Sequence, residues 1–181
     1  MTTSVTIAID PGLDGAIACL GGTELYEVVD MPTRIARTKR KRNNKGVMVN
    51  INYREVDPDG IDKVFTAMHR AWSPNGHTSP HVVIEKVWSS PGAGVSSTWT
   101  FSGAYHTPIG IACGRGWVLT TVTPTIWKGD LGLSSDKYES LVMARRLWPE
   151  HADSFKRVKD ADRAEAALLG VYVARGNEVA A

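Results

Sequence analysis

Residues 5–12 read Val-Thr-Ile-Ala-Ile-Asp-Pro-Gly, and this short stretch decides the fold. Its apolar residues predict a buried strand, and the Pro-Gly pair predicts a turn directly after it. Asp10 is the last residue before that turn. Because an ionised carboxylate is rarely buried without a partner, Asp10 is either a simple turn former or part of a functional site.

Two further apolar segments follow at once and extend this strand into a sheet. Residues 15–20 and 24–29 are separated by two glycines, which predicts an antiparallel meander with tight turns. Additional strands are predicted over 81–87 and 117–122. Apolar residues at helical spacing predict helices over 57–72, 97–113 (with a kink or break at Pro108), from 124, over 135–149 and over 160–174. This order predicts an α/β chain whose sheet is part antiparallel and part parallel.

Charge is distributed unevenly along the 181 residues. The formal net charge is +2, but residues 34–45 hold seven basic and no acidic residues. The rest of the chain has 14 basic and 19 acidic residues, a net charge of −5. A turn sequence at 43–46 and alternating apolar residues after it predict a β-hairpin over 34–53 with a basic first arm and tip. Such an element suits a polyanion, since phosphate binding releases counterions, although a solvated surface loop would have the same composition.

The overall composition, 43% hydrophobic and 22% charged, is that of an ordinary globular protein, and 181 residues fit a single domain. The longest apolar stretch, 166–174, is too short for a membrane span, and the N-terminus lacks the basic region of a secretory signal. We therefore expect no membrane partner. Cys19 and Cys113 lack metal-site spacing and are expected to be reduced core residues of a cytosolic protein.

Three other carboxylates stand in apolar surroundings. Glu85 lies in the apolar run 82–87, and Asp162 and Glu165 lie three residues apart on one face of a helix rich in Ala and Leu. Each alone has an ordinary explanation, such as an ion pair or a helix N-terminus. Together with Asp10 they match a two-metal phosphodiesterase, because hard oxygen ligands suit Mg²⁺ or Mn²⁺. No His/Cys cluster, Ser/His/Asp grouping or Walker-type loop is apparent in the sequence.

The motifs around these acids resemble those of the RuvC family of Holliday junction resolvases, within the ribonuclease H-like superfamily. Residues 9–12 (Ile-Asp-Pro-Gly) resemble its first-strand motif, and residues 84–88 (Ile-Glu-Lys-Val-Trp) resemble its fourth-strand motif. Residues 162–166 (Asp-Arg-Ala-Glu-Ala) resemble its final-helix motif. The resemblance extends over residues 5–174, and the motifs occur in the family's order.

The resemblance implies a ribonuclease H-like fold: a mixed five-stranded sheet flanked by helices, with the basic hairpin inserted. It implies that four acids converge, bind two Mg²⁺ ions per active site (Mn²⁺ would substitute) and are catalytic: Asp10, Glu85, Asp162 and Glu165. The implied activity is the nicking of Holliday junctions and other branched DNA in recombination, repair or phage DNA processing. One metal ion would activate water and the other would stabilise the leaving 3′ oxygen, so that 5′-phosphate ends result. The implied location is the cytoplasm of a bacterium, or of the bacterial host if the chain is phage-encoded.

The resemblance also supplies candidate partners and DNA contacts. Lys128 and Lys137 match two family lysines and are expected on backbone phosphates. Trp88 matches an aromatic residue that contacts the junction core, so it is either a stacking residue or a core tryptophan. The basic hairpin completes the candidate DNA-binding set with Arg34, Arg37, Lys39, Arg40, Lys41, Arg42 and Lys45. A homodimer is implied through the helix over 97–113, whose aromatic residues would be interface anchors or core residues: Trp99, Phe101 and Tyr105.

Two features depart from the better-known bacterial members. Glu165 stands where they usually have Asp, which would shift the metal preference. The hairpin is longer and more basic and is more typical of bacteriophage versions, which are thought to cut a broader range of branched DNA. Asp160 competes with Asp162 as the first acid of the last helix, but its spacing from Glu165 places it on another face, where we expect a helix cap.

Three alternatives remain at this point. An RNA or RNA–DNA hybrid nuclease of the same fold would use the same carboxylates. A basic nucleic-acid-binding module without catalysis would bind tightly and with strong salt dependence but would not cleave. The actin-like ATPase and sugar-kinase group shares a related strand and turn, but this chain is too short for the two domains that its ATP cleft needs.

Overall fold

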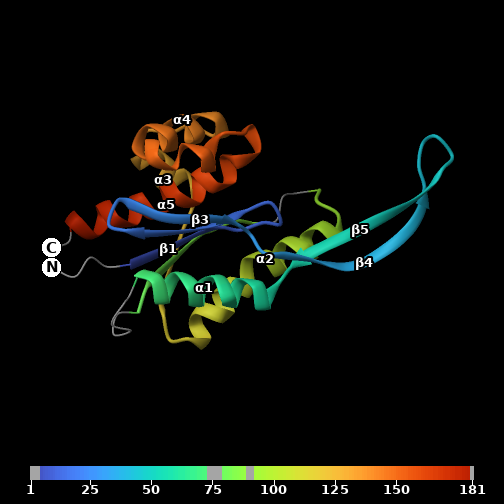
Figure 1. Cartoon of the computed structure of the whole chain (residues 1–181), viewed down its shortest axis with the longest axis horizontal. Helices are drawn as coiled ribbons and strands as arrows, with labels where there is room; N and C mark the ends of the chain where they lie inside the picture. The colour runs from blue at the N-terminus through green and yellow to red at the C-terminus, as the bar shows by residue number, and fades with distance from the viewer. Residues whose placement is uncertain (1–4, 73–78, 89–91, 180–181) are drawn as a thin grey trace.

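The computed structural model describes residues 5–72, 79–88 and 92–179, and its centre is a five-stranded mixed sheet (Figure 1). The first three strands form the predicted antiparallel meander: β1 (Val5–Asp10), β2 (Ala16–Gly21) and β3 (Glu24–Asp30). On the other side of β1 lie two strands parallel to it, β6 (His81–Glu85) and β7 (Val118–Val122). The strand order β3-β2-β1-β6-β7 confirms the predicted ribonuclease H-like sheet.

Helices cover both faces of this sheet (Figure 1). One face carries α1 (Pro58–Trp72) and α2 (Val95–Gly114). The other carries α3 (Pro124–Asp130), α4 (Lys137–Leu147) and α5 (Ala161–Val179), with 3-10 turns η1 (Pro149–Phe155) and η2 (Val158–Asp160) between α4 and α5. Alternation along β1 explains the two layers, because Ile7 and Ile9 belong to the core beneath α1 and α2, whereas Ala8 belongs to the core beneath α5.

One glycine on α5 faces the sheet where a larger residue would not fit. A Cβ atom added to Gly170 of α5 would stand 2.4 Å from Leu20 Cδ1 and 3.2 Å from Leu20 Cγ on β2. Leu20 is fully buried, so it has little room to withdraw. This contact limits the residue at position 170 to glycine where α5 packs on β2, in the same helix whose first turns carry Asp162 and Glu165.

The predicted basic hairpin is confirmed as a separate two-stranded ribbon, β4 (Thr33–Arg42) and β5 (Met48–Val56), which projects away from the rest of the molecule (Figure 1). Its register shifts between Ile35 and Arg37, so a bulge separates the base from the outer part. At the base, the Arg54 guanidinium donates to the carbonyl of Leu13 at 2.8 Å and to Asp14 Oδ1 at 2.9 Å. These bonds tie the ribbon to the loop that follows β1.

Two expectations were wrong. Of the kink or break predicted at Pro108, the break is wrong, because α2 runs without interruption from Val95 to Gly114 with Pro108 buried. Cys113 is exposed at the end of α2, so only Cys19 is a core cysteine, and burial raises the pKa of the Cys19 thiol to about 12. In the part of the chain that the structure describes, no helix has both the length and the apolar character needed to cross a membrane.

Candidate active site

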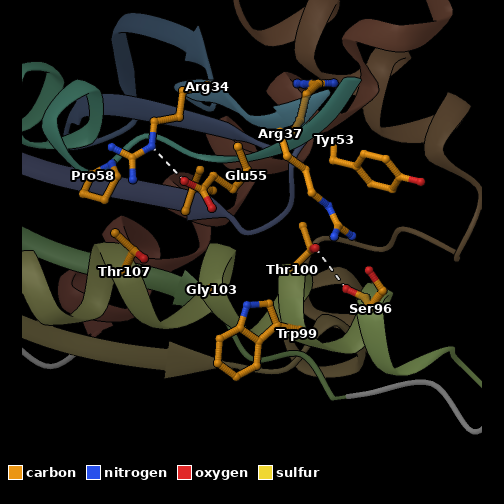
Figure 2. Close-up of a pocket in the computed structure, with 13 residues that line it drawn as sticks. Arg34, Arg37, Tyr53, Glu55, Pro58, Ser96, Trp99, Thr100, Gly103 and Thr107 are labelled. Carbon is orange, nitrogen blue, oxygen red and sulfur yellow. Dashed lines mark hydrogen bonds and ion pairs between the residues drawn. The ribbon is translucent and has the colours of Figure 1, made fainter. Parts of the chain in front are cut away.

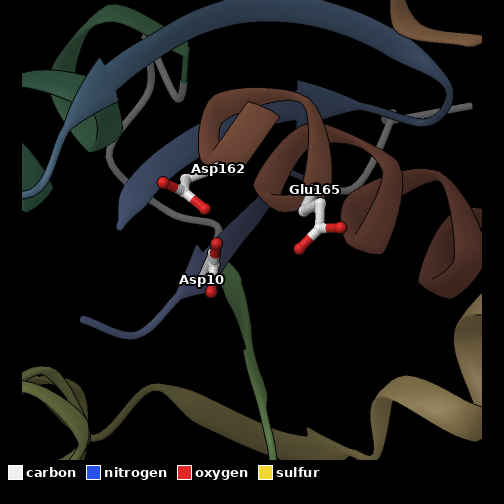
Figure 3. Close-up of side chains that lie close together, drawn as sticks. All are labelled: Asp10, Asp162 and Glu165. Carbon is white, nitrogen blue, oxygen red and sulfur yellow. The ribbon is translucent and has the colours of Figure 1, made fainter. Parts of the chain in front are cut away.

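Three carboxylates from two elements meet above the end of β1 (Figure 3). Asp10 ends β1, and α5 brings Asp162 and Glu165 over it. Oxygen atoms of the three side chains all lie within 4.8 Å of one another. The predicted spacing of three residues on α5 therefore does place both acids on the side that faces Asp10. We call these three residues the acidic triplet.

The turn after β1 has a shape that only glycine permits at one position. A Cβ atom on Gly15 would lie 2.1 Å from the carbonyl oxygen of Asp10, closer than any side chain can approach a backbone oxygen. The carbonyl of Gly15 also accepts the backbone N–H of Met31 at 2.8 Å, which anchors the turn to the end of β3. The tight turn thus holds Asp10 at the edge of the sheet, under α5.

Glu85 ends the strand next to β1, one position after the paired residues Ile9 and Ile84. It is buried, but its carboxylate lies outside the acidic triplet, and its Oε2 accepts the indole N–H of Trp127 at 2.9 Å. Trp127 was not among the predicted site residues. The signal that could have found it is its place on the short helix opened by Pro124, since a buried indole N–H requires an acceptor.

The site concentrates negative charge in a buried place. Burial raises the pKa of Asp10 well above its usual value, and the neighbouring charges of Glu85, Asp162 and Glu165 raise it further. Burial also raises the pKa of Glu85, although its hydrogen bond from Trp127 works in the opposite direction. The cluster is therefore costly as a set of carboxylates alone and is suited to a bound cation.

Both predicted lysines lie inside this site rather than beside it. Lys128 Nζ contacts Glu165 Oε1 at 2.5 Å, and its side chain is only 12% exposed. Lys137 Nζ bonds to Asp162 and lies 3.9 Å from Glu165 Oε2, but its side chain is 57% exposed. Burial acts to lower the pKa of Lys137, yet the surrounding acids outweigh it and raise that pKa. The two lysines thus differ in how freely they could meet a substrate.

Of two further polar residues, Ser140 and Asp160, only Ser140 bonds to the triplet. The Ser140 hydroxyl on α4 donates to Glu165 Oε1 at 3.3 Å, a contact that the sequence did not indicate. Asp160 is buried but bonds elsewhere: its carboxylate accepts the backbone N–H of Arg157 at 2.7 Å and the Arg157 guanidinium at 2.6 Å. Asp160 therefore closes the capping box of the 3-10 turn η2 as its third residue and does not cap α5, whereas Asp162 is the acid that faces Asp10.

The aromatic candidates are mostly on the surface. Trp88 is 73% exposed, with the Lys86 ammonium 5.0 Å from the centre of its ring, so the alternative that it is a core tryptophan is wrong. Trp99 on α2 is 82% exposed and is likewise no core residue. Phe101 and Tyr105 are partly buried, and Tyr105 packs on the core beneath α1.

The basic residues of the ribbon are exposed along β4 and at the tip. At the base, Arg34 pairs with Glu55 at 2.9 Å, and the Arg37 guanidinium lies 4.4 Å from the centre of the Tyr53 ring. These groups line a cavity of about 470 Å³ between the ribbon and the N-terminal half of α2, where Trp99 also lies (Figure 2). Positive charge therefore extends from the tip of the ribbon to the base.

No protein-family model matches the chain, and no curated protein sequence is significantly similar to it. Among solved structures, RuvC of Thermus thermophilus in complex with a Holliday junction substrate aligns with a TM-score of 0.52 and 16% identity, over 95% of this chain and 96% of that one. A second structure of Thermus thermophilus RuvC aligns with a TM-score of 0.49 and 15% identity, over 96% of both chains. The yeast mitochondrial Holliday junction resolvase Ydc2 aligns with a TM-score of 0.43 and 13% identity, over 96% of this chain and 78% of that one. The first of these likenesses shows that the chain has the RuvC-like resolvase fold.

Proposed function

We propose that the protein is a divalent-metal-dependent, structure-specific endonuclease that nicks Holliday junctions and other branched DNA. One observation carries the proposal: the acidic triplet, with oxygens within 4.8 Å of one another, in the fold of an enzyme whose solved structure holds a Holliday junction substrate. A bacteriophage origin of the chain stays a prediction.

The donor set fits a hard divalent cation. Asp10, Asp162 and Glu165 would hold Mg²⁺ or Mn²⁺ through carboxylate oxygens, with Glu85 completing a second position from the neighbouring strand. The raised pKa of Asp10 supports this, because it reflects negative charge that a cation would offset. When bound, the two ions would lower the pKa of the attacking water and stabilise charge on the departing 3′ oxygen.

The chain's own residues would keep the donors in place. The Trp127 indole N–H fixes the carboxylate of Glu85, and Lys128 and Ser140 fix the carboxylate of Glu165. Lys128 is too enclosed to leave Glu165 easily, so we assign it a positioning role. Lys137 is exposed and would exchange Asp162 for a phosphate oxygen of the DNA next to the cut.

A binding module without catalysis explains the site less well. Buried carboxylates would repel a phosphate backbone, and their desolvation would lower stability without benefit to binding. A nuclease needs them for its cations. The presence of four acids at one edge of the sheet therefore favours catalysis over passive binding.

We also propose a homodimer, since a four-way junction has two symmetric strands to cut. The N-terminal half of α2 exposes the large apolar side chains of Val95 and Trp99, which suits an interface. Light scattering of the protein with DNA tests this. A dimer that dissociates in the Trp99→Glu variant is expected, and a monomer at all working concentrations would contradict the proposal.

The central experiment compares four substrates with Mg²⁺: a four-way junction, a Y-fork, a linear duplex and an RNA–DNA hybrid, each followed by mapping of the nicks. Paired symmetric cuts in the junction, with 5′-phosphate ends and no cutting in EDTA, are expected. Cutting of the hybrid alone would overturn the proposal. Asp10→Asn is the matched control and is expected to bind the junction without cutting it.

A further inference from the structure

The outer part of the ribbon, beyond the bulge, has two faces of different chemistry. Paired residues of an antiparallel ribbon share a face, so the register divides the ribbon into two sets. The polar face carries Thr38, Arg40 and Arg42 opposite Asn52, Asn50 and Met48. The mixed face carries Arg37, Lys39 and Lys41 opposite Tyr53, Ile51 and Val49.

The residue types on the mixed face are those expected to stabilise the ribbon itself. Its apolar residues on β5 are partly buried, which is consistent with cover from the long basic side chains opposite. Arg37 and Lys39 both lie over the Tyr53 ring, at 4.4 and 6.0 Å from its centre. At the base this face turns toward α2, because Tyr53 and Thr100 line the same cavity (Figure 2).

The residue types on the polar face are not those expected to stabilise a ribbon. Asn is among the residues least favoured in strands, yet two consecutive positions on this side of β5 are Asn50 and Asn52, and both are exposed. The Thr38 hydroxyl donates to Asn52 Oδ1 at 2.8 Å, which orients that amide and leaves its two N–H donors for a partner. Val or Thr at these positions would make a more stable ribbon.

We propose that the polar face reads base edges in the major groove of a DNA duplex. A two-stranded ribbon fits the major groove, which is about 12 Å wide. From Thr38 to Arg42 the strand rises about 14 Å at about 3.4 Å per residue, the length of roughly four base pairs. Arg is the side chain that pairs with guanine O6 and N7, and Asn is the one that pairs with adenine N6 and N7. Four of the six residues on this face are of these two types: Arg40, Arg42, Asn50 and Asn52.

The polar face is also the side of the ribbon that leads to the acidic triplet. Arg54 continues the series of Asn50 and Asn52 along β5, and it lines a cavity of about 440 Å³ together with Asp14 and Asp162. Its bonds to the loop after β1 fix the ribbon relative to Asp10. If the proposed function holds, the duplex read by the polar face is therefore an arm of the branched DNA at a set distance from the cut.

The test is binding in EDTA, where no cutting is expected, with duplex and junction DNA in which 7-deazaguanine and 7-deazaadenine replace the purines. These bases pair normally but lack the N7 acceptor of the major groove. The wild-type protein is expected to lose affinity by about 5- to 150-fold, the range of one good bidentate contact. The Asn50→Ala/Asn52→Ala variant keeps the net charge, and it is expected to bind ordinary DNA more weakly and to be less sensitive to the deaza bases.

The matched control is Lys39→Ala/Lys41→Ala on the mixed face. It is expected to lower affinity for all sequences alike and to reduce the slope of affinity against salt by about two, while sensitivity to the deaza bases remains. Circular dichroism and thermal unfolding establish that each variant is folded, and Arg40→Lys supplies a second variant that keeps the charge.

Equal affinity of the wild-type protein for ordinary and deaza DNA would overturn the inference, and contacts to phosphates alone would then account for the ribbon. This failure is distinct from failure of the proposed function. A protein that cuts junctions without sensitivity to the deaza bases would refute only the groove contact. A protein that shows that sensitivity but does not cut in Mg²⁺ would refute only the nuclease.

Discussion

Replacing Gly170 by Ala should destabilise the protein through a single contact between α5 and the sheet. The added Cβ atom would stand 2.4, 3.1 and 3.2 Å from Cδ1, Cδ2 and Cγ of Leu20, so the whole Leu20 side chain would have to change its χ1 rotamer within a packed core. Leu20 is fully buried, and overpacking of a tight core costs about 1–3 kcal/mol. The higher helix propensity of Ala returns about 1 kcal/mol.

Gly176 supplies a matched control on the same helix. It is exposed, and a Cβ atom there would meet nothing within 4 Å, so Gly176→Ala gains helix propensity without overpacking. The difference in free energy of unfolding between the two variants is therefore the overpacking energy itself, about 1–3 kcal/mol. For a chain of this size each kcal/mol corresponds to a shift of about 2–4 °C in Tm.

The assay is denaturant unfolding of both variants, completed by a double-mutant cycle with Leu20→Ala. Removal of the Leu20 side chain should cost less in the Gly170→Ala background than in the wild type, because it also relieves the clash. Equal stability of the Gly170→Ala and Gly176→Ala variants would refute the reasoning. It would mean that α5 does not pack on β2 as closely as the structure describes.

Three further predictions concern stability and reactivity. Asp10→Asn should raise the free energy of unfolding in EDTA by about 1 kcal/mol or more at neutral pH, because the folded state raises the pKa of Asp10. Measured by urea titration, this gain should shrink as the pH falls and vanish below about pH 3, where the carboxyl is protonated in both states. A thiol assay should find one reactive group per native chain, Cys113, and two in denaturant, because Cys19 is buried with a pKa of about 12. Two fast-reacting thiols in the native protein would contradict the burial of Cys19. The ring of His81 bonds to Thr120 at 2.7 Å, and burial lowers the pKa of His81, so the folded state favours the neutral imidazole. The free energy of unfolding should therefore fall as the pH drops below about 6.5, where the unfolded chain takes up a proton. The His81→Gln variant should lack this part of the pH dependence.

The parts of the fold that depend on local sequence pattern could be predicted from the sequence. Pro-Gly after Asp10 and the turn at 43–46 mark the ends of strands whether or not the rest of the chain is known, and both predicted turns are present. The continuation of α2 through Pro108 was not predictable in this way, because Pro108 is buried by residues distant in the sequence. The exposure of Cys113 was not predictable either, because it depends on where Cys113 lies on α2 once the helix has packed.

At the site, the acids could be predicted but not their partners. Asp10 and Glu85 end neighbouring strands, and Asp162 and Glu165 share a helix face, so the pattern places the four acids at one edge of the sheet once the strand order is assumed. Only Asp10, Asp162 and Glu165 bring their carboxylate oxygens together, and Glu85 stays outside that group. The bond from Trp127 to Glu85 joins residues 42 positions apart. The place of Trp127 on the short helix after Pro124 indicates that its indole N–H needs an acceptor, but not that this acceptor is Glu85. Long-range polar contacts of this kind depend on the packed geometry of α3 against β6, which the spacing of residues does not encode.

The uneven charge of the chain has a consequence for how DNA would reach the site. A phosphate backbone that approaches the acidic triplet meets repulsion, which Lys128 and Lys137 only partly cancel. The ribbon, whose basic residues lie well away from those acids, can hold the same DNA through counterion release. Attraction at the ribbon must therefore exceed repulsion at the triplet before any cation is bound, and a divalent cation then removes the repulsion. On this basis the affinity for DNA should rise when Ca²⁺, which neutralises the acids without supporting cutting, is added in place of EDTA. Asp10→Asn should reduce that increase, whereas Lys39→Ala/Lys41→Ala should lower both affinities and preserve their ratio.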